Sequence, residues 1–170
     1  RQIAEAGKHV YTEKPISNIL ADGLRMEALQ KKHNVTMTVG HSARLLKGIQ
    51  MMKDNLDNGS LGKLAFIEAN FSNERALELT PDTWRWYRDR APGGPLSQLA
   101  IHMFDILHYL GGDVAAVSSI ASKLSPVGAE VDDQSMSTVR FKNGVLGYVG
   151  SCWTSPGIFS TRVFAQSGLM

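Results

Sequence analysis

The first forty residues alternate between a strand pattern and a helix pattern. Residues 8–13 are predicted to form a short strand. The strand ends at Pro15, because the residue before a proline favours extended geometry. A helix is expected from Ser17, which can cap it, to about His33. Residues 35–40 form a second apolar run. This strand–helix–strand order predicts a parallel α/β unit, with too few strands for a complete doubly wound domain.

The expected helix carries its own packing and termination signals. Asn34 can close it in left-handed geometry, and basic residues fill its last turn, where they suit the helix dipole. One apolar stripe at four-residue spacing predicts the face that packs on the sheet: Leu20, Leu24 and Ala28.

From residue 41 onward the pattern changes from α/β to mixed α+β. A helix is expected from Leu45 to Asn58, followed by Gly59. A second, longer helix is expected from Leu96 to Leu110. The first of these helices has apolar residues at Leu45, Ile49, Met52 and Leu56.

The segments between and after these helices have the period of strands. In the first strand, Ala65, Ile67, Ala69 and Phe71 share a face. Asn143-Gly144 predicts a type I′ hairpin between the last two strands. The strands are expected at 63–72, 116–122, 135–142 and 145–153. We therefore predict an α+β fold: an open, mostly antiparallel sheet with helices on one face, preceded by the strand–helix–strand unit.

Composition narrows the class of protein. Lys and Arg number 18 against 16 Asp and Glu, the net charge is +2, and no basic block occurs, so nucleic acid is not expected as a partner. No apolar run reaches the roughly 20 residues that span a membrane. Cys152 is the single cysteine, which fits a reducing compartment, and a cytoplasmic location is expected.

The helix at 96–110 carries a stripe of polar residues beside an apolar face. One interpretation is a solvated side on which His102 is half-buried; the other is a general acid/base at His102, oriented by Asp105. Gly93-Gly94 before it leaves room for a ligand or a neighbouring backbone. The stripe is Gln98, His102, Asp105 and Tyr109, and the apolar face is Leu99, Ile106 and Leu110.

Two further chemical hypotheses come from the residues. His102 and His108 lie on different sides of the helix, and no third ligand is evident, so no metal site is expected. The segment WRWYRDR at 84–90 is either a surface loop that covers the edge of the core or an anion-binding loop that uses Arg85 or Arg88.

Several motifs, taken in order, resemble one family. AGKHVYTEKPIS resembles the Glu-Lys-Pro signature of the glucose–fructose oxidoreductase/inositol dehydrogenase family (Gfo/Idh/MocA), and MTVGHSAR is similar to its next strand. NGSLGKLAFIEANFS, GGPLSQLAIHMFDILHYLGG and VDDQSMSTVRFKNGVLGYVGSCW are similar to its second-domain start, active-site helix and later strands. Each motif alone is weak, but the resemblance extends in order over nearly the whole chain.

The resemblance implies a nicotinamide-dependent oxidoreductase and assigns roles to particular residues. Lys14 and His102 are the implied catalytic residues, with His102 accepting the substrate's hydroxyl proton. Gln98 departs from the family pattern, where many members carry Asp, and an amide cannot hold a proton at neutral pH. The implied cofactor contacts are Glu13, Lys14 and Pro15, and the implied substrate contacts are Arg85, Gln98 and Asp105.

The same resemblance implies a domain plan. Residues 1–43 correspond to the end of a dinucleotide-binding domain, and 44–170 to a substrate-binding and oligomerisation domain. The glycine-rich loop that holds NAD or NADP lies upstream in the family, so the chain is expected to be a fragment. The expected substrate is a sugar, cyclitol or similar hydroxylated molecule, and the open sheet face is expected to form a homodimer or homotetramer. The alternative is a catalytically silent binding or oligomerisation domain.

Overall fold

The computed structural model describes residues 1–170 and divides into two compact units, residues 1–42 and residues 43–170. Each unit has its own sheet. None of the helices combines the length and the hydrophobicity that crossing a bilayer would require.

The first unit is the predicted strand–helix–strand, with a short helix before it. Strands β1 and β2 pair in parallel, with Val10 opposite Met37. Asn34 closes helix α2 in the left-handed region, as predicted. The elements are α1 (Gln2–Glu5), β1 (Val10–Thr12), α2 (Leu20–His33) and β2 (Met37–Val39).

Two expectations for α2 are wrong. The helix begins three residues after Ser17, whose hydroxyl instead accepts a hydrogen bond from the Ile19 N–H, so the turn is made before the helix. The predicted apolar stripe is not a buried face, because Leu20 and Leu24 are 80% and 56% exposed. Two strands of three residues offer too little surface to cover a helix of fourteen.

The second unit is a six-stranded sheet in the order β4-β5-β6-β3-β7-β8. Only β3 and β6 pair in parallel; all other neighbours are antiparallel, which confirms the predicted α+β class. The strands at the C-terminal end, β7 and β8, were missed by the sequence pattern. The strands are β3 (Leu64–Ser72), β4 (Val114–Ser122), β5 (Gln134–Phe141), β6 (Leu146–Cys152), β7 (Ile158–Ala165) and β8 (Gly168–Leu169).

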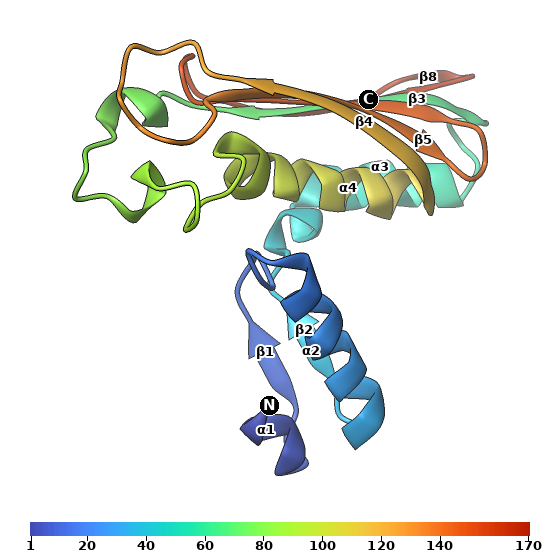
Figure 1. Cartoon of the computed structure of the whole chain (residues 1–170). Coiled ribbons are helices and arrows are strands. Elements are labelled where there is room, and N and C mark those ends of the chain that lie inside the picture. Colours follow the sequence, from blue (N-terminus) through green and yellow to red (C-terminus); the bar gives the residue numbers. More distant parts are fainter. The chain divides into compact units, whose positions relative to one another are not determined.

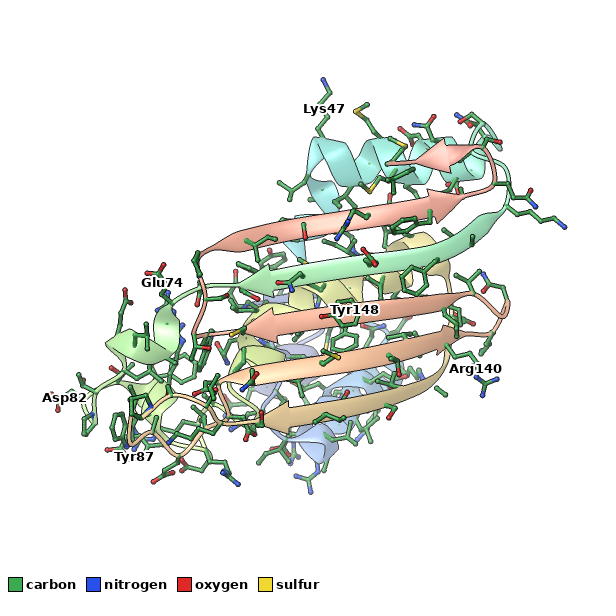
Figure 2. All side chains as sticks on the ribbon, turned by 90° about the horizontal axis from the view of Figure 1, so that it is seen from above. Lys47, Glu74, Asp82, Tyr87, Arg140 and Tyr148 are labelled. Carbon is green, nitrogen blue, oxygen red and sulfur yellow. The ribbon has the colours of Figure 1, made fainter.

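Helices cover one face of this sheet and leave the other open, as Figures 1 and 2 show. We call the covered face the inner face and the open one the outer face. The helical segments are η1 (Ser42–Leu45), α3 (Lys47–Asp57), η2 (Arg75–Glu78), η3 (Trp84–Trp86), η4 (Leu96–Ala100) and α4 (Ile101–Gly111). Helix α3 begins after Leu45, which lies in η1 and is exposed, so Leu45 does not belong to the packing stripe as predicted.

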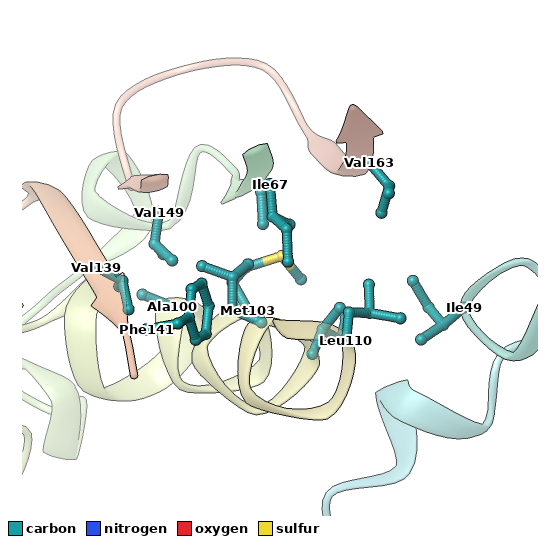
Figure 3. Packing of buried hydrophobic residues seen from close by; sticks show 12 residues of the cluster. Ile49, Ile67, Ala100, Met103, Leu110, Val139, Phe141, Val149 and Val163 are labelled. Atoms are coloured by element: carbon teal, nitrogen blue, oxygen red, sulfur yellow. The ribbon is translucent and has the colours of Figure 1, made fainter. Parts of the chain in front are cut away.

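The core lies between α4 and the inner face. Met103 points from the helix toward Ile67 of β3, and both are fully buried (Figure 3). The predicted apolar face of the helix, Leu99, Ile106 and Leu110, is buried. The predicted alternation of β3 holds at Ile67 and Ala69 but fails at Ala65, where a bulge between Leu64 and Phe66 shifts the register.

The predicted hairpin joins β5 and β6, but its turn is not type I′. Gly144 has a φ of 89°, whereas Asn143 keeps a negative φ. The Gly144 N–H donates to the Phe141 carbonyl, and the Phe141 N–H donates to Val145, so the loop has three residues. The Asn143 side chain accepts a hydrogen bond from the Val145 N–H and donates one to the Gly111 carbonyl. These bonds hold the turn in a form other than type I′.

Gly94 packs against a neighbouring backbone, one of the two possibilities that the sequence raised. A Cβ at this position would lie 2.0 Å from the Asp132 carbonyl oxygen, and the φ of Gly94 is +49°. We expect Gly94→Ala to lower the free energy of unfolding by about 3 kcal/mol or more, measured by urea denaturation.

Gly48 in α3 is the matched control, because a Cβ there would meet nothing within 4 Å. Gly48→Ala should leave the free energy of unfolding unchanged or raise it by less than about 1 kcal/mol. Equal effects of the two substitutions would contradict the close approach at Gly94.

Candidate functional site

The candidate site is built around the start of α4, where the backbone departs from a regular helix. Residues 96–100 form one π-helical turn, η4, directly before Ile101. Such turns occur frequently at functional sites, and they change which residues share a face. His102 follows in the first turn of α4 and is half-buried.

Two members of the polar stripe are buried, against the interpretation that places them on a solvated side. Gln98 is only 7% exposed, and its neighbours Leu99 and Ala100 are buried as well. The Asp105 side chain is 6% exposed. These two members of the stripe face protein rather than water, whereas His102 and Tyr109 are half-buried.

An aromatic cluster lies beside His102 on the inner face. The Phe71 ring, from the end of β3, lies 6.0 Å from the imidazole between ring centroids. Phe159 of β7 meets Phe71 edge-on, with a centroid distance of 5.1 Å and an interplanar angle of 73°. Phe71 and Phe159 are directly opposed in the β3–β7 register.

Asp105 is held by an arginine that the sequence analysis did not single out. Arg44 in η1 donates from Nε to Asp105 Oδ2 at 2.8 Å and from Nη2 to Oδ1, a two-point contact. These hydrogen bonds raise the pKa of the Arg44 guanidinium, and burial opposes part of that rise. The guanidinium also lies 5.3 Å from the centroid of the Tyr109 ring.

The other histidine of this helix is in a different environment. His108 is largely exposed, and its Nε2 lies 3.7 Å from a carboxylate oxygen of Asp113. The hydrogen bond from Lys142 lowers the pKa of the Asp113 carboxyl group. The positive charge of Lys142 and the hydrogen bond from His108 lower this pKa further.

The arginines of the WRWYRDR segment differ in what they contact. Arg88 donates from Nε and Nη2 to the Glu130 carbonyl, at 3.0 and 2.8 Å, and so ties two loops together. Arg85 stacks on the Trp84 ring at 4.3 Å. Burial lowers the pKa of the Arg85 guanidinium, and the like charge of Arg75 lowers it further. An anion at Arg85 would stabilise the charged guanidinium and so oppose both effects.

In the first unit, the Glu-Lys-Pro motif follows the carboxyl end of β1. Gly40 follows the neighbouring end of β2, where an added Cβ would lie 2.6 Å from the Tyr11 hydroxyl and 3.5 Å from a Glu13 carboxylate oxygen. The absence of a side chain at Gly40 thus lets the Tyr11 hydroxyl occupy this place, near the strand ends where parallel sheets bind ligands.

The predicted site residues are divided between the units. Glu13, Lys14 and Pro15 belong to the first, and Arg85, Gln98, His102 and Asp105 belong to the second. That Lys14 and His102 act together stays a prediction.

Residues 49–170 match the family model for the GFO/IDH/MocA C-terminal domain. A myo-inositol 2-dehydrogenase from Thermotoga maritima is 32% identical over 159 residues, which cover 86% of this chain and 43% of the relative. The chain therefore spans less than half the length of this relative.

Solved structures show the same fold. A protein described as a putative NADPH-dependent oxidoreductase from Desulfitobacterium hafniense superimposes with a TM-score of 0.91 at 39% identity, over 97% of this chain and 47% of that chain. A levoglucosan dehydrogenase, solved with NADH and levoglucosan, gives a TM-score of 0.90 at 26% identity, over 98% of this chain and 48% of its own.

The contact between Arg44 and Asp105 should stabilise the protein. We expect Arg44→Ala to lower the free energy of unfolding by roughly 2–4 kcal/mol, because it leaves a nearly buried carboxylate without its cation. Urea denaturation at neutral pH measures the loss.

The surface pair between Lys142 and Asp113 is the control, since both side chains are about two-thirds exposed. Lys142→Ala should change the free energy of unfolding by less than about 1 kcal/mol. A loss at Arg44 no larger than that at Lys142 would refute the structural role of the buried pair.

Proposed function

Because this chain belongs to the GFO/IDH/MocA family, we propose that it is the substrate domain of an NAD(P)-dependent oxidoreductase, joined to the last strands of the cofactor domain. Residues 44–170 bind a sugar, cyclitol or related hydroxylated substrate, and residues 1–43 contact the cofactor. The observation that carries the proposal is the setting of His102, half-buried at a π-turn and beside an aromatic ring on the inner face.

The reaction is the oxidation of a secondary alcohol to a ketone. A bound nicotinamide cofactor supplies the hydride acceptor. His102 accepts the hydroxyl proton at an imidazole nitrogen while the C–H bond breaks, so that the carbon–oxygen double bond forms. Lys14 donates a hydrogen bond to the same hydroxyl oxygen and favours its negative charge as the proton leaves. In the reverse direction His102 returns the proton.

The residues around His102 have supporting roles in this proposal. Asp105 orients the imidazole and is itself fixed by Arg44. Gln98 takes the position of the family's aspartate, where it can donate and accept hydrogen bonds but cannot exchange a proton. Arg85 binds a polar or anionic group of the substrate. Its guanidinium stacks on the Trp84 ring, and this contact leaves the N–H donors at the edge of the guanidinium able to bind the substrate.

Glu13, Lys14 and Pro15 hold the nicotinamide end of the cofactor. The support for this is the place of the motif, which directly follows the carboxyl end of the first of two parallel strands, where such sheets bind ligands. The levoglucosan dehydrogenase that shares the fold was solved with NADH.

The outer face of the sheet joins copies of the protein as a homodimer or homotetramer. No helix covers it, and Tyr148 stands near its centre in Figure 2. Exposed Ile120 and Met136 lie with Tyr148 around a hollow of about 320 Å³. A broad open face of this kind suits an isologous contact, in which the same surface serves both partners.

His102→Ala should lower kcat by about 100-fold or more in the full-length protein, because it removes the proton acceptor. Initial rates with NAD⁺ and with NADP⁺, on sugars and cyclitols such as myo-inositol and levoglucosan, measure the effect.

The matched control is His108→Ala, because His108 lies on the same helix but is largely exposed. That variant should keep kcat within about twofold of the parent. If His102→Ala turned over as fast as His108→Ala, the catalytic role of His102 would be excluded.

The association of copies is tested by molar mass in solution. We expect light scattering to give the mass of a dimer or tetramer, and Met136→Glu to reduce it, because two like charges would face each other across the contact. Leu124→Glu, which changes a leucine in a loop that is more exposed than Met136, should leave the mass unchanged. A parent protein that stays monomeric at high concentration would refute the proposal.

A further inference from the structure

We infer that Phe159 is a specificity-determining residue: its ring is a platform on which the carbon face of a ring-shaped polyol packs while a hydroxyl meets His102. This rests on the proposed function and names the class of substrate that the site selects. The platform is defined by Phe159 and by Phe71, which stands behind it.

Two ring contacts connect this platform to the candidate acid/base. Phe159 meets Phe71 edge-on at 5.1 Å, and Phe71 lies 6.0 Å from the His102 imidazole. The edge-on arrangement is the favoured geometry for aromatic pairs, so Phe71 fixes the orientation of the Phe159 ring. The three rings come from β3, β7 and α4, which the core holds together.

The inner face changes character along β7. Val163 is fully buried in the core, whereas Phe159, four residues earlier on the same face, is 41% exposed. Phe71 beside it is only partly exposed and packs against both core clusters. A large apolar ring at the end of the core thus remains accessible, in contact with the Phe71 ring that neighbours His102.

The same two strands carry a second aromatic pair on the opposite face. Phe66 and Phe164 are directly opposed across β3 and β7, with centroids 5.9 Å apart. Successive side chains along a strand point to opposite faces of the sheet. Phe66 is an odd number of residues from Phe71, and Phe164 is an odd number from Phe159, so this second pair points to the outer face. This pair has the same composition and the same strands, but no imidazole beside it.

The chemistry of a cyclic polyol explains the fit. Its hydroxyl groups need polar partners, but its ring C–H bonds form an apolar surface that carries slight positive charge. The face of a phenyl ring carries the complementary negative charge of its quadrupole. A binding site for such a molecule therefore combines a few polar groups with an apolar wall.

This role predicts a change in KM more than in kcat. The platform contacts carbon atoms away from the reacting bond, so it binds substrate and transition state alike. We expect Phe159→Leu, which keeps an apolar side chain but loses the ring, to raise KM about tenfold for cyclic polyols. Phe159→Tyr keeps the ring and should keep KM within about twofold.

The experiment uses the full-length protein, with a panel of cyclic polyols that includes myo-inositol and levoglucosan, and with both NAD⁺ and NADP⁺. Phe164→Leu is the matched control, and it should leave KM and kcat unchanged. Thermal unfolding by circular dichroism compares the folding of all three variants.

The outcomes separate the platform from the proposed function. Turnover by the parent protein with an unchanged KM in Phe159→Leu would overturn the platform and leave the proposed function standing. An equal rise of KM in Phe164→Leu would also overturn it, because the effect would then be a general loss of packing. Absence of turnover with every polyol and both cofactors would overturn the proposed function, and the platform with it.

Discussion

The burial of α4 against one face of the sheet is the contact on which the second unit depends. Met103, Ile106 and Leu107 are almost fully buried there, and the burial of such apolar side chains stabilises the packed unit. Because the helix is fixed along this line, the residues at its first turn have fixed positions as well. His102 owes its place beside Phe71 to the same packing that stabilises the fold.

A charged contact complements this apolar one. Asp105 sits on the same helix as Met103 but on a different side, and its carboxylate is desolvated. Such a group is unfavourable unless it is paired, and Arg44 supplies two parallel hydrogen bonds. The pair connects η1 to α4, so one contact satisfies a buried charge and links the start of the second unit to its central helix.

The sequence predicted what depends on local pattern. The parallel strand–helix–strand, the left-handed Asn34 and the buried face of α4 all follow from spacing and residue type, and the structure has them. The sequence failed where tertiary contacts decide. The burial of Gln98 was not expected from its place in a polar stripe, and the Asn143 side-chain bonds replaced the expected type I′ turn. Arg44 was not singled out because its partner lies 61 positions away, and β7 has no clean alternation because its exposed end breaks the pattern.

The parallel pairing of β3 with β6 has a consequence for how the chain is made. These two neighbours at the middle of the sheet come from distant parts of the sequence, with Phe66 opposite Leu146, and β7 pairs with β3 from still further along. A ribosome has therefore released the whole of α4 before either partner of β3 exists. Before β6 and β7 emerge, the apolar side of the helix has only β3, β4 and β5 to pack against, and late closure of long loops completes its cover. Part of the main hydrophobic surface of this unit therefore stays exposed until late in synthesis, and chaperones have access to it during that time.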